Sequence, residues 1–214
     1  MNKKIAKLYD AGEVDRAIHL LIKEIDQHPK QVENYLQLST YLIEQNSPDQ
    51  ALELLQKAQS LIDKPQELVY NIAVCYYMQG EFKKSLALLD TLPNNDETLY
   101  QKALVFMKLG QYQKALAYAM TIKLSDERTL ELLGDIWLSL GNLQQANSSY
   151  SAINTEKRNA KVNFLLGLTV LDQDRKKAQE YFKRSEKKDS AYFANAKKQY
   201  AALMEMVRGE NGKN

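Results

Sequence analysis

A short motif recurs along this chain: a glycine, an apolar residue two positions later and a small residue five positions later. Its copies begin at Gly12, Gly80, Gly110 and Gly141, and a fifth copy begins at Asn46 in place of glycine. Successive copies are 34 (12 to 46), 34 (46 to 80), 30 (80 to 110) and 31 residues (110 to 141) apart. Each copy lies between two stretches with helical apolar spacing. A period of this size predicts a stack of two-helix repeats.

This pattern resembles the tetratricopeptide repeat, a unit of 34 residues that folds as helix A, a tight turn and helix B. At the family's small position the chain has alanine in four copies and Ser85 in the copy that begins at Gly80. A small side chain there lets helix B approach helix A closely. Glycine suits the turn because it adopts a left-handed conformation at no steric cost. The resemblance implies an all-α fold, a right-handed α-solenoid of helix-turn-helix repeats with a C-terminal capping helix.

The resemblance covers roughly residues 1–188. We expect a single solenoid domain at residues 1–208, followed by a disordered polar tail at 209–214. The sixth repeat is degenerate because its turn, Asp172–Asp174, lacks glycine. The expected elements are repeats at about residues 1–31, 32–65, 66–95, 96–126, 127–159 and 160–188, and a capping helix at 190–207.

The expected capping helix carries one apolar stripe. A terminal repeat exposes an apolar face, which a helix with a polar outer side covers. We therefore interpret this segment as a cap, and the alternative is a helix that binds a partner or a second copy of the chain. The stripe consists of Phe193, Ala196, Tyr200, Leu203 and Val207.

The third and fourth repeats are shorter than the 34-residue period, and the missing residues fall at the end of helix B. Pro93 ends helix B of the third repeat about one turn early. We predict that this shortening changes the superhelical curvature locally.

Composition argues against several classes of protein. The chain is 44% hydrophobic and 26% charged, as an ordinary globular protein is. The single cysteine, Cys75, cannot form an internal disulfide, which favours a reducing compartment. The basic N-terminal segment lacks the apolar stretch of a signal peptide, and no apolar run has the length of a membrane span. We expect a cytoplasmic protein without membrane insertion.

Charge is distributed unevenly along the sequence. Residues 1–154 carry 15 Lys and Arg against 19 Asp and Glu, whereas residues 155–214 carry 14 against 8. The basic C-terminal third suggests nucleic-acid binding as an alternative function. The argument against it is that acidic residues are mixed with the basic ones and no regular aromatic platform accompanies them. We favour a solvated helix surface.

No arrangement of residues indicates an enzyme, a cofactor or a metal site. His19 and His28 lie nine residues apart, which does not match the i, i+4 pair of a helical zinc site. Cys75 falls in an apolar helix and has no histidine near it in sequence, as expected of a buried inert thiol. The glycine loops of nucleotide-binding proteins and the nucleophile elbow of hydrolases do not occur. We predict a non-catalytic protein with no cofactor.

In the family that the chain resembles, the A helices line a concave groove that binds peptides. The residues at the groove positions do not match the family's carboxylate clamp for peptide C-termini. Asn71 matches the middle asparagine of the clamp, but the neighbouring positions are Leu36 and Thr40 before it and Glu97 and Gln101 after it. Tyrosines and amides stand there instead, and the alternative is that the tyrosines pack between neighbouring A helices. The candidate groove residues are Gln37, Thr40, Tyr70, Asn71, Val74, Tyr77, Tyr100, Gln101, Leu104, Arg128, Glu131 and Asp135.

We predict from these features a protein- or peptide-binding adaptor or assembly scaffold that uses its concave groove. The alternatives are a regulator that senses a short peptide and nucleic-acid binding through the basic C-terminal third. The sequence identifies neither the partner nor the oligomeric state.

Overall fold

The computed structural model describes residues 2–211, with side chains placed for residues 2–205. In this part of the chain every regular element is a helix, which confirms the all-α class. The chain forms two compact units, residues 1–111 (unit 1) and residues 112–214 (unit 2), and each is described separately. The helices are α1 (Lys3–Asp10), α2 (Val14–Gln27), α3 (Val32–Glu44), α4 (Pro48–Gln59), the 3-10 helix η1 (Pro65–Leu68), α5 (Val69–Met78), α6 (Phe82–Leu89), α7 (Asp96–Lys108), α8 (Tyr112–Thr121), α9 (Glu127–Ser139), α10 (Leu143–Ala152), α11 (Ala160–Val170), α12 (Arg175–Lys188) and α13 (Ser190–Asn211).

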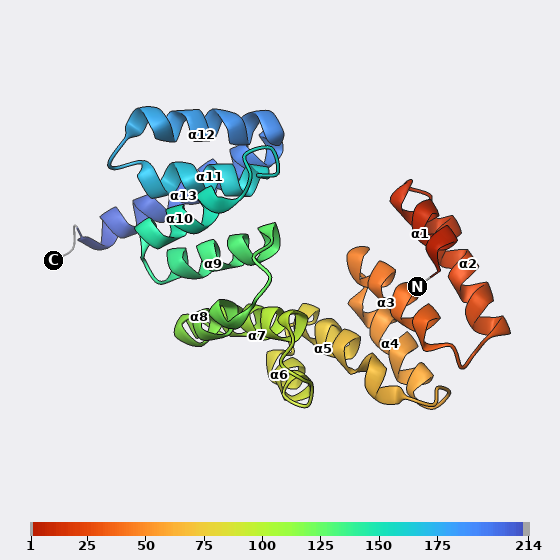
Figure 1. Ribbon diagram of the computed structural model, residues 1–214. Helices are drawn as coiled ribbons and strands as arrows, with labels where there is room; N and C mark the ends of the chain where they lie inside the picture. Colours follow the sequence, from red (N-terminus) through yellow and green to blue (C-terminus); the bar gives the residue numbers. More distant parts are fainter. Residues whose placement is uncertain (1, 212–214) are drawn as a thin grey trace. The chain divides into compact units, whose positions relative to one another are not determined.

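The helices pair in the order that the repeat predicts (Figure 1). In unit 1, α1 packs on α2, α3 on α4, and α5 on α6. In unit 2, α9 packs on α10 and α11 on α12. The apolar core is shared between successive repeats, since one buried cluster joins Tyr35 of α3, Leu55 of α4 and Ile72 of α5. The second and third repeats therefore stabilise each other, as neighbouring repeats do in other repeat proteins.

The left-handed turns lie at the motif positions. Gly12, Gly80, Gly110 and Gly141 have φ between 69° and 85°, and Asn46 has φ 56°. Asparagine is one of the few residues other than glycine that tolerates this region, which explains the substitution. Among the described residues, none in the turn of the sixth repeat has a left-handed backbone conformation.

The small position of the motif is buried in every repeat that has it. Ala17 and Ala146, for example, are fully buried between helix A and helix B. Ser85 keeps the position polar, but its hydroxyl donates a hydrogen bond to the Ala73 carbonyl across the helix pair (2.7 Å). The buried hydroxyl is thereby satisfied, which a buried polar group requires.

Two glycines inside A helices admit an aromatic ring from helix B. A Cβ atom on Gly134 would lie 2.3 Å from a ring carbon of Tyr150, and one on Gly167 would lie 2.4 Å from a ring carbon of Phe182. No side chain fits at these distances. In unit 2 the contact between helix A and helix B thus depends on glycine in α9 and α11.

Helix α6 is short, as the position of Pro93 predicts. It has 8 residues, whereas α2 has 14 and α4 has 12. The loop that follows α6 is tied to α7 by Lys102, whose buried ammonium group contacts Asp90 (2.9 Å) and Asn94 (3.0 Å). The effect of the short helix on superhelical curvature stays a prediction, because the repeats concerned belong to two units.

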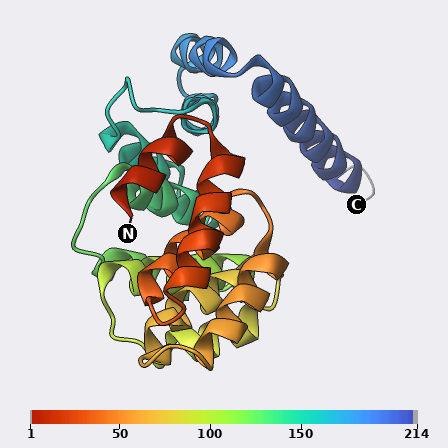
Figure 2. The ribbon, with the colours of Figure 1, turned by 90° about the vertical axis from the view of Figure 1, so that its right-hand side faces the viewer.

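Helix α13 packs on α11 and α12, and its C-terminal half extends beyond them (Figure 2). Phe193 at its start lies against Phe164 and Phe182, with ring centroids 6.0 and 6.3 Å apart. Leu203 is 57% exposed, so the expected apolar stripe is covered only in its first half. The helix runs to Asn211, and the expected domain bounds, with a tail from residue 209, stay a prediction. Residues 212–214 and the side chain of Val207 lie outside the described part.

Candidate functional site

The predicted groove residues all lie on A helices. Those on α3, α5 and α7 belong to unit 1, and the three on α9 belong to unit 2. The two sets form two faces, which we name the unit 1 face and the unit 2 face. The unit 1 face comprises Gln37, Thr40, Tyr70, Asn71, Val74, Tyr77, Tyr100, Gln101 and Leu104, and the unit 2 face comprises Arg128, Glu131 and Asp135.

Gln37 is buried and links two segments of the chain through hydrogen bonds. Its side chain is 4% exposed. Its Oε1 accepts a hydrogen bond from the Asn2 backbone N–H (2.7 Å), and its Nε2 donates to the Asn2 carbonyl (3.2 Å) and the Tyr41 hydroxyl (2.8 Å). These bonds join the start of α1 to α3. The polar atoms of Gln37 are therefore already satisfied within the chain.

Asn71 performs the same task between α3 and α5. Its Nδ2 donates a hydrogen bond to Ser39 Oγ (2.8 Å), with longer contacts to Thr40 Oγ1 (3.4 Å) and the Leu36 carbonyl (3.5 Å). The Thr40 hydroxyl donates to the Leu36 carbonyl (2.8 Å) and remains exposed. The amide of Asn71 thus joins neighbouring repeats, which weakens the expectation that it pairs with a peptide backbone.

Gln101 occupies the same repeat position as Asn71, nine residues before the turn glycine. It is 5% exposed, and its Nε2 has no hydrogen-bond partner among the described residues. The repeat positions of Ser39 and Thr40 are filled on α5 by Ala73 and Val74, which offer no side-chain acceptor. The missing hydroxyls account for the unpartnered amide, because buried donors otherwise find an acceptor.

The tyrosines of the unit 1 face are partly buried. Tyr70 and Tyr77 pack against an apolar cluster that includes Ala73 and Leu89, and the Tyr77 ring lies 5.9 Å from that of Phe82. Burial raises the pKa of the Tyr77 hydroxyl. Tyr100 is also partly buried. The alternative that these side chains pack between helices therefore holds in part, while each keeps some exposed surface.

Val74 and Leu104 complete the unit 1 face with partly exposed aliphatic side chains. A hollow of about 290 Å³ lies near one edge of this face, at the start of α5 and α7. Tyr70 borders it, and the loop residues Leu92 and Pro93 form part of its wall. Pro93 indicated from the sequence that α6 ends early, and it ends at Leu89, but the sequence did not indicate this hollow.

The unit 2 face is a network of charges. Lys161 of α11 donates hydrogen bonds to Glu131 Oε1 (2.9 Å) and Asp135 Oδ2 (2.5 Å) on α9. The hydroxyl of Tyr150, a fully buried residue of α10, donates to Asp135 Oδ1 (2.7 Å). The structure thus brings Glu131 and Asp135 together through a cation. Arg128 lies exposed one turn before Glu131 on the same helix.

The electrostatics of this network follow from its burial. Burial works to lower the pKa of Lys161, but the carboxylates of Asp135 and Glu131 outweigh it and the pKa is raised. Burial also raises the pKa of Tyr150, and the negative charge of Asp135 adds to the effect. Tyr150 was not predicted as a site residue. The signal for it is the glycine at position 134, which leaves room for its ring.

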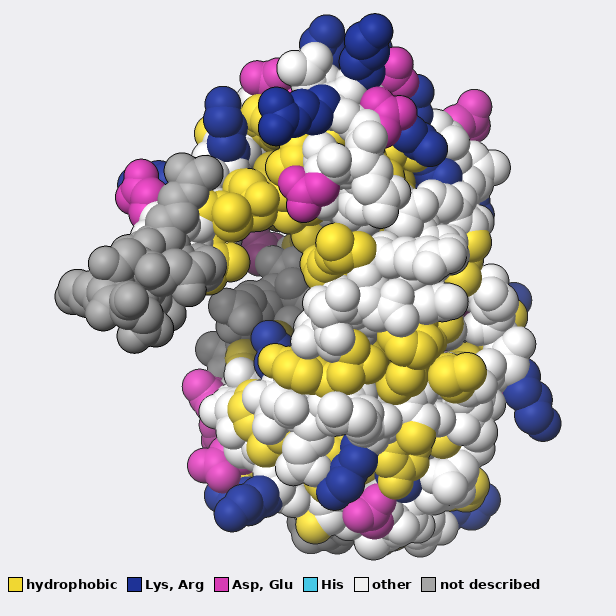
Figure 3. Space-filling view, turned by 90° about the vertical axis from the view of Figure 1, so that its left-hand side faces the viewer, with side chains coloured by type: hydrophobic (Ala, Val, Ile, Leu, Met, Phe, Trp, Pro, Cys, Tyr) yellow, Lys and Arg dark blue, Asp and Glu magenta, His cyan; other side chains and the backbone are white. Residues whose placement is uncertain are grey.

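Charges of both signs cover the surface of α12. Figure 3 shows Lys and Arg side chains beside Asp and Glu at the top of the view, where α12 lies, with hydrophobic side chains below them. Helix α12 begins Arg175-Lys176-Lys177 and also contains Glu180 and Glu186. Mixed signs of this kind are typical of a solvated helix surface.

Within residues 2–211 no helix is both long and apolar enough to cross a membrane. In the same part of the chain no three His, Cys, Asp or Glu side chains gather in a way that suits a metal ion.

Comparison with known proteins finds one family model that matches part of the chain. Residues 42–105 match the tetratricopeptide repeat. No curated protein has a sequence that matches this chain.

Solved structures share the fold at low sequence identity. One is PilW, a widely conserved type IV pilus biogenesis factor (TM-score 0.72, 17% identity, 86% of this chain and 90% of that one). Another is a chain of the APC/C hetero-tetramer Cut9–Hcn1 (TM-score 0.70, 17% identity, 87% of this chain). The present chain covers only 39% of the length of that one. A third is YrrB, a tetratricopeptide repeat protein with an unusual peptide-binding site (TM-score 0.55, 22% identity, 83% of this chain and 97% of that one).

Proposed function

We propose that this chain, of which residues 42–105 match the tetratricopeptide repeat, is a member of that family and a non-catalytic adaptor or assembly scaffold that binds a protein or peptide through the unit 1 face. The structures that it resembles support a protein-interaction scaffold in general. YrrB carries a peptide-binding site, and Cut9 and PilW belong to a protein assembly and to pilus biogenesis. Those partners belong to those proteins and are not carried over.

The observation that carries the proposal is the composition of the unit 1 face. Its amides are already bonded or buried, whereas Tyr70, Val74, Tyr100 and Leu104 keep partly exposed aromatic or aliphatic surface on two neighbouring A helices. Aromatic side chains contribute large contact area with little loss of conformational freedom, and they are enriched in protein interfaces. We therefore expect apolar contact, and not amide pairing, to provide most of the affinity.

Site-specific photo-cross-linking in the source organism tests this proposal. Benzoylphenylalanine is placed at Thr40, Val74 or Leu104 on the unit 1 face. The matched controls are Ile22 and Leu61 of the same unit, which lie on α2 and after α4 and are 45% and 47% exposed. We expect the three test positions to form an adduct with the same partner and the controls to form none. The controls are at least as exposed as the test positions at 74 and 104, so non-specific cross-linking would favour the controls.

Two outcomes would count against the unit 1 face as the binding surface. In the first, Ile22 and Leu61 give the same adduct as strongly as Val74 and Leu104. In the second, no position gives an adduct, although the purified variants retain the circular dichroism of the wild-type chain. Either result would move the search to another surface.

The proposal includes a cytoplasmic location. Its support is Cys75, a single thiol that is fully buried and whose pKa burial raises to about 12. A single cysteine cannot form an internal disulfide, so the fold does not depend on an oxidising compartment. Fractionation of cells that express the chain with a C-terminal epitope would test the location.

A further inference from the structure

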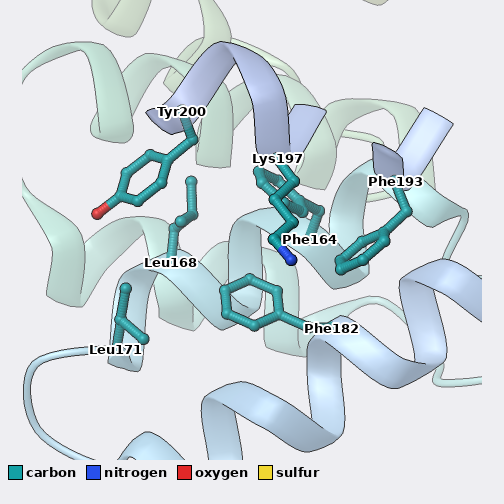
Figure 4. A pocket seen from close by; sticks show the side chains of 7 residues that line it. All are labelled: Phe164, Leu168, Leu171, Phe182, Phe193, Lys197 and Tyr200. Atoms are coloured by element: carbon teal, nitrogen blue, oxygen red, sulfur yellow. The ribbon is translucent and has the colours of Figure 1, made fainter. Parts of the chain in front are cut away.

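An apolar cavity of about 260 Å³ lies at the end of the repeat stack, between α11, α12 and α13. Figure 4 shows Tyr200 and Phe193 at opposite ends of it, with Lys197 between them. Every lining side chain except Lys197 is aromatic or aliphatic. The lining consists of Phe164, Leu168, Leu171, Phe182, Phe193, Lys197 and Tyr200.

The cavity follows from the way α13 covers the last repeat. Phe164, Phe182 and Phe193 form a tilted cluster, with Phe164 and Phe182 ring centroids 5.4 Å apart. Tyr200 stands two helical turns after Phe193 on the same face of α13. The residue that lines the cavity between them is Lys197, which carries a charge where an apolar side chain would fill the space. The cover is therefore incomplete.

Lys197 gives the cavity an electrostatic preference. It is exposed and forms no ion pair with any described residue. Among the described residues that line the cavity, none is acidic. An anion beside the cavity would thus gain a partner that the chain itself does not supply.

The volume indicates what kind of group fits. Pockets that enclose a whole small molecule have about 300–1,000 Å³, so this cavity is smaller than a typical ligand pocket. A cavity of about 150 Å³ lined by aliphatic and aromatic side chains is large enough for a benzene ring. One phenyl or isobutyl group therefore suits the space, and the rest of the bound molecule remains outside.

We propose that this cavity receives one Leu or Phe side chain from an extended segment of a partner protein, and that an Asp or Glu next to that residue pairs with Lys197. The inference takes from the proposed function only that the partner is a protein, and it concerns a different unit of the chain. The apolar side chain supplies affinity, and the acidic neighbour supplies selectivity.

The probe is the capped heptapeptide GSDLDGS, titrated to several millimolar into the full-length chain labelled for NMR spectroscopy. We expect saturable shift changes at Phe164, Leu168 and Phe193. Replacing the leucine of the probe by alanine should weaken binding about tenfold or more, because a buried Leu side chain is lost. Replacing its two aspartates by lysine (GSKLKGS) should weaken binding about fivefold or more.

Charge reversal in the protein separates the contribution of Lys197 from general electrostatics. In Lys197→Glu the preference should invert, so that GSKLKGS binds about fivefold or more tightly than GSDLDGS. The matched control is Lys198→Glu, which makes the same change one position along α13, away from the cavity lining. It should alter the affinity for either peptide by less than about twofold. Both residues are exposed, so neither variant should unfold the chain.

The proposal is overturned if GSDLDGS produces no saturable shifts at the cavity, or if Lys198→Glu inverts the preference as strongly as Lys197→Glu. Equal affinity for the acidic and basic probes in the wild-type chain would also overturn it. These outcomes are distinct from failure of the proposed function, since the cross-linking positions lie in unit 1. Adducts at the unit 1 face without peptide binding at the cavity would reject the cavity proposal alone. Peptide binding at the cavity without adducts at the unit 1 face would reject the proposed function of that face alone.

Discussion

Within each unit, side chains link neighbouring repeats at comparable places, but the two units use different kinds of interaction. In unit 1 the ties are neutral amides, with Gln37 reaching Asn2 and Asn71 reaching Ser39. In unit 2 the tie is ionic, with Lys161 bridging Glu131 and Asp135. Neutral ties tolerate changes of salt and pH, whereas a partly buried ion pair leaves an uncompensated charge when one member is removed. The repeat therefore dictates where helices meet but not how they are held.

The largest expected effect comes from Lys161→Met. The substitution keeps the aliphatic stem and leaves Glu131 and Asp135 to repel each other. Their side chains are 26% and 25% exposed, so solvent screens part of the cost, and we expect a loss of about 2 kcal/mol in the free energy of unfolding. Urea unfolding followed by the fluorescence of Trp137, the single tryptophan, reports on unit 2.

The matched control for that variant is Lys157→Met. Lys157, in the loop after α10, pairs with Glu127 of the same helix α9, but the side chains are 61% and 45% exposed. Little or no change in the unfolding midpoint is expected for this surface pair. An equal loss in both variants would show that charge number, and not the bridging of two carboxylates, determines the stability of unit 2.

Asn71→Ala should produce the next largest effect, in unit 1. The variant removes the hydrogen bond to Ser39 and leaves a small void, with an expected cost of about 1.5 kcal/mol. Hydrogen exchange measured by mass spectrometry should show faster exchange in α3 and α5 than in the wild-type chain. Unchanged exchange in both helices would mean that the amide tie contributes nothing to the contact between these repeats.

Gln101→Met should change stability in the opposite direction. The buried amide nitrogen of Gln101 lacks an acceptor, and methionine replaces it with an apolar side chain of similar length. We expect a gain of about 0.5–1 kcal/mol, because the cost of an unsatisfied buried donor disappears. Thermal unfolding monitored by circular dichroism measures it, and a lower melting temperature than that of the wild-type chain would contradict it.

The smallest expected effect is on how the stability of unit 2 changes at alkaline pH. In the unfolded chain tyrosine ionises near pH 10, whereas burial and Asp135 raise the pKa of Tyr150 in the folded chain. The unfolded form then loses its proton first, so stability that is present below about pH 10 falls as the pH rises above it. Tyr150→Phe should flatten this fall in the Trp137-detected unfolding of unit 2. A slope equal to that of the wild-type chain would exclude Tyr150 as its source.

The local features of the fold were predictable from the sequence because they depend on single residues. Gly80 is needed for a left-handed turn, and Pro93 ends a helix, whatever surrounds them. The extent of α13 was less predictable. Its polar C-terminal residues read as a tail, but a helix that has already begun continues at little cost.

The candidate site was predictable only as a set of positions. The period indicates that Asn71 and Gln101 lie on equivalent faces, and the structure agrees. What each amide does depends on the residues of the preceding repeat, Ser39 and Thr40 in one case and Ala73 in the other. Pairwise contacts across repeats of unequal length are not visible in the spacing of one chain. For the same reason the role of Tyr150 emerged only with the structure.

The short helix α6 has a consequence for cooperativity. In a linear array each repeat communicates with its neighbours only through their shared interface, so the smallest interface determines where opening can begin. Between α6 and α7 the ammonium group of Lys102, held by Asp90 and Asn94, stands in for a missing turn of helix. Within unit 1 we therefore expect opening to begin near Pro93, where Lys102 adds to the apolar contacts among Leu89, Leu92 and Val105.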